Sequence, residues 1–173
     1  MLETRLARID DAGAITELQI KSWRHRGINA VEFDDSHDVR KTWEYAIASL
    51  QSTGRVLVVE ASERLVGFCA ITISEQSGYS EMVALEVDPD FRREGVATRL
   101  MNAAADIAAR MNTDVIRAWV EESETAAQSL LVGTGWQKSG AERVIRTDGG
   151  TTDESSQAGR ERHESEWITF LID

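Results

Sequence analysis

The hydrophobic pattern of the chain alternates between the period of β-strands and the period of amphipathic helices. Three apolar, β-branched runs at 56–61, 65–73 and 80–87 follow one another closely and predict three strands. Their nearly continuous apolar character indicates strands that are covered on both faces. Further strands are predicted at residues 4–9, 115–120, 136–146 and 167–172.

Helical spacing of apolar residues marks four other segments. The clearest begins after Gly95, where one stripe is formed by Ala97, Leu100, Met101, Ala104, Ile107, Ala108 and Met111. Other helices are expected after Asp10 or Asp11 (with Ile15, Leu18, Trp23), after Ser36 (with Val39, Trp43, Ala46, Ile47, Leu50), and after Ser123. The order of elements predicts a mixed α/β (α+β) fold with one central sheet.

The segment 147–166 is polar and almost free of large apolar residues. We expect a mobile loop between two strands, because the one strand after it cannot form a domain by itself. A length of 173 residues suits one compact domain, so residues 1–173 are predicted to form a single domain.

The charge and composition of the chain argue against some kinds of binding partner. The formal charge is −11, from 19 Lys and Arg against 30 Asp and Glu, and such a chain is repelled by nucleic-acid phosphates. Only three cations are lysines, which is typical either of proteins adapted to high salt or of ordinary acidic proteins. No apolar run of membrane-spanning length and no secretory leader is visible, so no membrane partner and a cytoplasmic location are expected.

Cysteine and histidine usage points away from disulfide and metal chemistry. The single cysteine, Cys69, lies inside an apolar strand and is expected to be a buried thiol rather than a nucleophile. No Cys/His spacing typical of zinc ligands occurs, so no metal is expected. His25, His37 and His163 lie in polar segments and are expected at the surface.

The stretch with candidate chemistry joins the strand at 80–87 to the long helix. Pro89 ends the strand, and a turn containing Gly95 leads into the helix, whose first N–H groups and positive dipole end favour anions. Arg92, Arg93 and Arg99 against Glu94 give a local charge of +2 in this acidic chain. A phosphate site and a plain connection with solvated arginines are both compatible with these residues. Neither a P-loop nor a dinucleotide-binding glycine motif is present.

The longer pattern L-x-V-x-P-x-x-R-x-x-G-[VI]-[GA]-x-x-L is more specific. It is formed by Leu85, Val87, Pro89, Arg92, Gly95, Val96, Ala97 and Leu100. This pattern resembles the acyl-CoA-binding motif of the GNAT superfamily of N-acyltransferases, and the order of elements fits that fold over the whole chain. The resemblance implies a mixed, partly splayed sheet flanked by about four helices.

The resemblance also implies a co-substrate and an acceptor. Acetyl-CoA would be held by Leu85, Val87, Arg92, Arg93, Gly95, Val96, Ala97 and Thr98, through strand backbone for pantetheine and N–H groups of 93–98 for pyrophosphate. The acceptor would be a primary amine of a small molecule, a peptide or a protein N-terminus, which attacks the thioester directly. A homodimer formed through residues 167–172 is a further possibility.

Candidate catalytic residues follow from the same resemblance. Glu81, six residues before Val87, stands where several branches of the family carry the general base; the alternative is a solvated residue at a strand start. Glu86 is expected on the face opposite Leu85 and Val87, where it binds the acceptor or pairs with an arginine.

The position of the general acid departs from the family pattern. Leu131 stands where many members carry a proton-donating tyrosine, and Glu124 where they carry an asparagine. Either water or another residue, such as Ser129, protonates the leaving thiolate, or the protein is a non-catalytic acyl-CoA-binding or regulatory module of the same fold.

Overall fold

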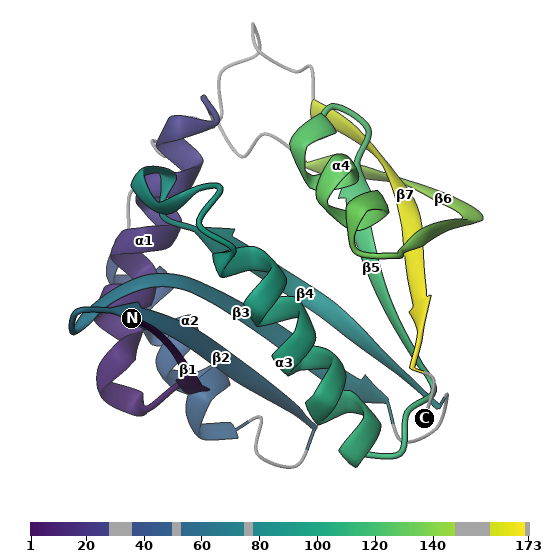
Figure 1. Cartoon of the computed structure of the whole chain (residues 1–173). Helices are drawn as coiled ribbons and strands as arrows, with labels where there is room; N and C mark the ends of the chain where they lie inside the picture. Colours follow the sequence, from purple (N-terminus) through teal and green to yellow (C-terminus); the bar gives the residue numbers. More distant parts are fainter. Residues whose placement is uncertain (28–35, 50–52, 75–77, 148–159, 172–173) are drawn as a thin grey trace, which may run out of the picture. The chain divides into compact units, whose positions relative to one another are not determined.

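The computed structural model describes residues 1–27, 36–49, 53–74, 78–147 and 160–171, which form two compact units (Figure 1). The first unit comprises residues 1–116 and 171–173, and the second comprises residues 117–170. The described ranges contain seven strands and four α-helices, which confirms the predicted mixed α/β class. None of these helices has the length and apolar character needed to cross a bilayer.

The first unit is built on an antiparallel sheet with the strand order β1-β2-β3-β4. Its strands are β1 (Leu2–Leu6), β2 (Gly54–Ala61), β3 (Arg64–Ser74) and β4 (Tyr79–Val87). Ser62 and Glu63 join β2 to β3 with φ angles of 49° and 64°, as the right-handed twist of a two-residue hairpin requires. The central residues of β2 and β3 are buried, as their continuous apolar runs predict.

Helices cover both faces of this sheet. On one face lie α1 (Ala12–His25) and α2 (Ser36–Ser49), where the Trp43 ring meets Phe68 edge-on at a centroid distance of 5.0 Å. The opposite face is covered by α3 (Val96–Arg110), and there the Cys69 Sγ lies 3.9 Å from the Leu100 carbonyl oxygen (Figure 1). Phe68 and Cys69 are consecutive, so the two faces of β3 are both core surfaces.

The N-terminal boundaries differ from the sequence prediction. The first strand ends at Leu6, and a short 3-10 turn, Ile9–Asp11, precedes α1. Asp11 does not cap α1; its carboxylate accepts from the Arg8 N–H at 2.6 Å and from the Arg5 guanidinium. The hydrogen bonds from Arg5 lower the pKa of Asp11 against the opposing effect of its burial. Leu50, expected on the second helix, lies outside the described residues.

The second unit contains three strands with the order β5-β7-β6 and one helix. These elements are β5 (Val115–Glu121), which begins in the first unit, α4 (Thr125–Gly133), β6 (Gln137–Thr147) and β7 (Arg160–Phe170). The helix begins at Thr125 after Glu124, so Ser123 is not its cap.

The predicted loop at 147–166 needs correction. Residues 160–166 belong to β7 and pair with β6, while residues 148–159 lie outside the described residues. The paired part is held by charges across the strands: Arg143 lies 2.7 Å from Glu164, and Arg146 lies 2.8 Å from Glu161. Such polar pairs stabilise the pairing of β6 with β7 but produce no hydrophobic pattern, and the sequence prediction therefore missed this part of the strand.

Candidate functional site

A β-bulge in β4 decides which way its side chains point. Ala84 lies opposite Ala70 and Met82 lies opposite Ile71, so Val83 has no counterpart on β3. Each inserted residue shifts the alternation of the strand by one. Glu81, opposite Thr72, therefore shares a face with Glu86, which lies opposite Phe68.

The predicted site residues of β4 point to two different faces of the strand. Leu85 lies opposite Cys69 and Val87 lies opposite Gly67, so both point to the α3 side. Glu81 and Glu86 point to the side of α1 and α2. Regular alternation from residue 81 to residue 87 would have placed Glu81 with Leu85 and Val87, and only the bulge separates them.

Glu86 is held by one donor from α1 and one from the residue that follows it. The Ser22 hydroxyl donates to Glu86 Oε2 at 2.6 Å, and the Arg26 guanidinium lies 2.5 Å from Oε1. Arg26 is the C-cap of α1, one turn after Ser22. The prediction that Glu86 faces away from Leu85 and Val87 is confirmed. Of the two alternatives for its side chain, binding the acceptor or pairing with an arginine, the structure shows the arginine pair.

The turn after β4 contains two residues with positive φ angles and leads into a helix without a side-chain cap. Pro89–Phe91 forms a 3-10 turn (η3), and residues 92–95 after it are exposed. Arg93 and Gly95 have φ angles of 66° and 79°, which turn the backbone sharply before α3. Gly95 precedes the helix and has no side-chain oxygen to cap it, so the first N–H groups of α3 are left for solvent or for an anionic ligand.

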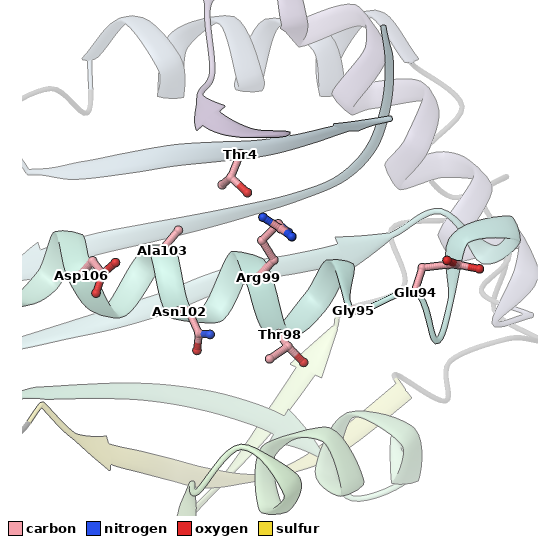
Figure 2. A pocket seen from close by; sticks show the side chains of 8 residues that line it. All are labelled: Thr4, Glu94, Gly95, Thr98, Arg99, Asn102, Ala103 and Asp106. Atoms are coloured by element: carbon pink, nitrogen blue, oxygen red, sulfur yellow. The ribbon is translucent and has the colours of Figure 1, made fainter. Parts of the chain in front are cut away.

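A groove of about 610 Å³ runs along the exposed side of α3 (Figure 2). It is lined by Thr4, Glu94, Gly95, Thr98, Arg99, Asn102, Ala103 and Asp106. Figure 2 shows Arg99 and Ala103 turned toward Thr4, while Thr98 and Asn102 lie on the other side of the helix. Gly95 and Thr98 are the predicted co-substrate residues that line this groove.

The remaining predicted residues lie along the same path from β4 to α3. Leu85, Val87 and Ala97 are half-buried, whereas Arg92 and Arg93 are exposed. Val96 is 1% exposed and contributes a side chain to the core rather than to an open site. The structure thus brings the strand end, the turn and the first turn of α3 together, with Glu81 on the other face of β4.

Two contributors to this region were missed from the sequence. Gly67 on β3 faces the start of α3, and a Cβ there would lie 2.5 Å from Val96 Cγ1. Asp88 is buried directly before the turn. A glycine inside a continuous apolar strand is a signal of close approach and could have indicated the first of them.

Several other expectations concern proton donors and nucleophiles. Leu131 is buried, and the Ser129 hydroxyl donates to the Thr125 carbonyl oxygen at 2.9 Å inside α4. Cys69 is buried as expected, and burial raises the pKa of its thiol to about 12, so it stays protonated at neutral pH. His25, His37 and His163 are exposed, as predicted.

The left-handed backbone conformation of Arg93 is expected to lower the stability of the folded chain. Arg93→Gly removes the steric strain of a side chain at φ 66°, whereas Arg92→Gly acts at φ −67°, where no strain exists. Both variants remove one exposed cation and add the same freedom to the unfolded chain. We expect Arg93→Gly to be more stable than Arg92→Gly by about 1 kcal/mol in urea unfolding. Equal stabilities would contradict this assignment of strain.

A strand that ends at a glycine turn before a long helix is an arrangement shared by several classes of phosphate-binding α/β proteins, so comparison with known proteins decides the class. A sequence profile of the acetyltransferase (GNAT) family matches residues 14–135. The chain therefore belongs to the GNAT family and is an acetyltransferase.

Comparisons with individual proteins agree with this assignment. An uncharacterized N-acetyltransferase of Archaeoglobus fulgidus is 27% identical over 132 residues, which cover 73% of this chain and 87% of the relative. The fold is similar to that of the PaiA N-acetyltransferase from Thermoplasma acidophilum in complex with coenzyme A (TM-score 0.72, 20% identity, 96% of this chain and 98% of that chain). It is also similar to the ribosomal-protein-S18-alanine N-acetyltransferase from Escherichia coli (TM-score 0.70, 17% identity, 100% and 96%).

Proposed function

We propose that the chain binds acetyl-CoA at the turn between β4 and α3 and transfers the acetyl group to a primary amine. The observation that carries this proposal is the turn itself. Residues 92–95 are exposed, Arg93 and Gly95 adopt positive φ angles, and the uncapped start of α3 follows. The N–H groups of residues 93–98 would bind the pyrophosphate, Arg92 and Arg93 would add positive charge, and the backbone of Leu85 and Val87 would pair with pantetheine. The coenzyme A complex of the similar Thermoplasma protein supports this choice of ligand.

Direct attack on the thioester requires a neutral amine, and we assign its deprotonation to Glu81. The Glu81 carboxylate takes one proton from the ammonium form of the acceptor, directly or through a water. The amine nitrogen then bonds to the thioester carbonyl carbon and the carbon–sulfur bond breaks. The nitrogen loses its surplus proton, which passes through water to the leaving thiolate, so that the products are the amide and the free thiol. The position of Glu81 on the face of β4 opposite Leu85 and Val87 supports an acceptor that approaches from the α1 and α2 side.

The acceptor class is a primary amine of a small molecule, a peptide or a protein N-terminus. The similarity to an enzyme named for an alanine of ribosomal protein S18 keeps the protein N-terminus among these acceptors. The negative charge of the chain favours a cationic amine over an acidic one, because opposite charges attract during encounter.

Isothermal titration calorimetry with acetyl-CoA and with coenzyme A tests the binding step. We expect one site with a Kd between roughly 1 μM and 1 mM, the usual range for substrates, and weaker binding at higher salt because phosphate charges take part. The absence of measurable heat for both ligands over this range would remove the proposal.

A second candidate, a non-catalytic acyl-CoA-binding or regulatory module, is favoured by one observation. Leu131, at the position of the usual proton donor, is a buried apolar residue. A thiol-release assay over a panel of amines separates the two functions. Binding of acetyl-CoA without release of thiol for any amine would favour the module.

A further inference from the structure

Asp88 is a buried carboxylate at the point where β4 ends and the turn begins. Its side chain is 4% exposed and accepts from two cations on different elements. Lys21 Nζ of α1 lies 2.6 Å from Oδ1, and the Arg64 guanidinium at the start of β3 lies 2.5 Å from Oδ2. Burial alone would raise the pKa of Asp88, but the hydrogen bond from Lys21 and the two positive charges lower it below its usual value, so the carboxylate is ionised at neutral pH.

The same contacts hold both ends of η3. Asp88 Oδ1 accepts from the Asp90 N–H at 3.0 Å, and the Asp88 carbonyl oxygen accepts from the Phe91 N–H at 2.8 Å. Arg64 also stacks over the Phe91 ring, with its guanidinium carbon 5.3 Å from the ring centroid. Arg64 therefore contacts the first residue before η3 and the last residue within it.

The turn at residues 92–95 is thereby anchored on both sides. Before it, Asp88 and Phe91 are held to α1 and β3 by Lys21 and Arg64. After it, Val96 is buried against β3 at the site of Gly67. These contacts fix the two ends of the exposed segment 92–95, whose own side chains are not buried.

We propose that Asp88 is a positioning residue for acetyl-CoA, which acts by holding η3 so that the following backbone N–H groups are preorganised for the pyrophosphate. This inference rests on the proposed function, because it assumes that acetyl-CoA binds at residues 93–98. Preorganised donors bind more tightly than mobile ones, since the ligand does not have to order the turn.

The charges around Asp88 allow a positioning role to be distinguished from a purely electrostatic effect of its charge on acetyl-CoA binding. The cluster contains two cations, Lys21 and Arg64, and two acids, Asp88 and Asp90, so its formal charge is zero. Asp88→Asn makes the cluster positive, and a purely electrostatic role would then strengthen the binding of polyanionic acetyl-CoA. A positioning role predicts the opposite sign, because the ion pairs that hold the turn are lost.

Asp90→Asn is the matched control. It changes the formal charge by the same amount and also removes an ion pair with Lys21, but the Asp90 side chain is 67% exposed and has no contact with Arg64 among the described ion pairs. In calorimetry we expect Asp88→Asn to raise the Kd for acetyl-CoA about tenfold and Asp90→Asn to change it less than twofold. The KM for acetyl-CoA should rise in parallel while kcat at saturation stays near that of the unmodified chain. An unchanged or lower Kd for Asp88→Asn would overturn the proposal.

Trypsin provides a readout that needs no acetyl-CoA. Arg92 and Arg93 are exposed cleavage sites inside the turn, and Lys41 on α2 is an exposed site outside it. We expect Asp88→Asn to speed cleavage after Arg92 and Arg93 several-fold without a change at Lys41, and Asp90→Asn to leave both rates unchanged. Equal acceleration at all sites would indicate general destabilisation and would overturn the local role.

A second variant keeps the test decisive if Asp88→Asn does not fold. Arg64→Met removes the ion pair with Asp88 and the cationic contact with the Phe91 ring. The Arg64 side chain is 55% exposed, and its replacement should speed cleavage after Arg92 and Arg93. Failure of the unmodified chain to bind acetyl-CoA would reject the proposed function, while the proteolysis would still show whether the cluster holds the turn. Unchanged cleavage in Arg64→Met would overturn the positioning role.

Discussion

Replacing Glu81 with glutamine is expected to lower kcat about 100-fold near pH 7 and by a much smaller factor near pH 10, because a general base contributes roughly this much. Glutamine keeps the size of the side chain but cannot accept a proton from the ammonium form of the acceptor. At alkaline pH the amine loses its proton to solvent, so the base is needed less. The measurement is the pH dependence of kcat with one amine at saturating acetyl-CoA.

Two controls accompany the Glu81→Gln measurement. Glu3→Gln, on the exposed side of β1, makes the same chemical change outside the site and should leave kcat unchanged. The Kd for acetyl-CoA of Glu81→Gln should also be unchanged, because Glu81 lies on the face of β4 opposite Leu85 and Val87. A pH profile of Glu81→Gln that coincides with that of the unmodified chain would exclude Glu81 as the base.

The substitution Gly67→Ala is expected to have the largest effect on stability. A Cβ at this position would lie 2.5 Å from Val96 Cγ1, 3.2 Å from Leu100 Cδ1 and 3.3 Å from the Glu86 carbonyl oxygen. Val96 and Leu100 are almost fully buried, so neither side chain can turn aside without disturbing other core contacts. Such overpacking costs about 1–3 kcal/mol, which corresponds to a fall in Tm of roughly 2–12 °C for a chain of this size. The start of α3 would shift away from β3, so the affinity for acetyl-CoA should fall as well.

Gly13→Ala in α1 provides the control for this prediction. The nearest atom to a Cβ at residue 13 is Arg40 Nη1 at 3.7 Å, an ordinary contact with a flexible side chain. Both substitutions restrict the unfolded chain to the same extent, so the difference between them reports the native state. We expect Gly13→Ala to stabilise the chain by about 0.5–1 kcal/mol through better helix propensity. A Tm for Gly67→Ala at or above that of the unmodified chain would show that α3 can move without cost.

Much of the first unit could be predicted from local pattern. The strands around Val58, Phe68 and Leu85 and the helix after Gly95 were all found, because buried strands and an amphipathic helix leave strong hydrophobic periods. The extension of β7 back to Arg160 was missed, because cross-strand ion pairs such as Arg143–Glu164 leave no such period. Two predicted helix caps were also wrong: the Asp11 carboxylate is bonded to Arg5 and Arg8 instead, and α4 follows Glu124 rather than Ser123.

By itself the sequence determined the class of protein and the segment, from the end of β4 to the start of α3, on which the candidate site lies. The pattern from Leu85 to Leu100, with its proline and glycine between a strand and a helix, predicted both the family and the turn that leads into α3, since backbone geometry and helix ends are local properties. Only the tertiary structure decided which side chains of β4 share a face and which contacts anchor the turn after it. The bulge at Val83 depends on pairing with β3, and the contacts of Asp88 with Lys21 and Arg64 join residues 67 and 24 positions apart. Long-range pairings of this kind exist only once the chain has folded, and the short pattern around each residue does not encode them.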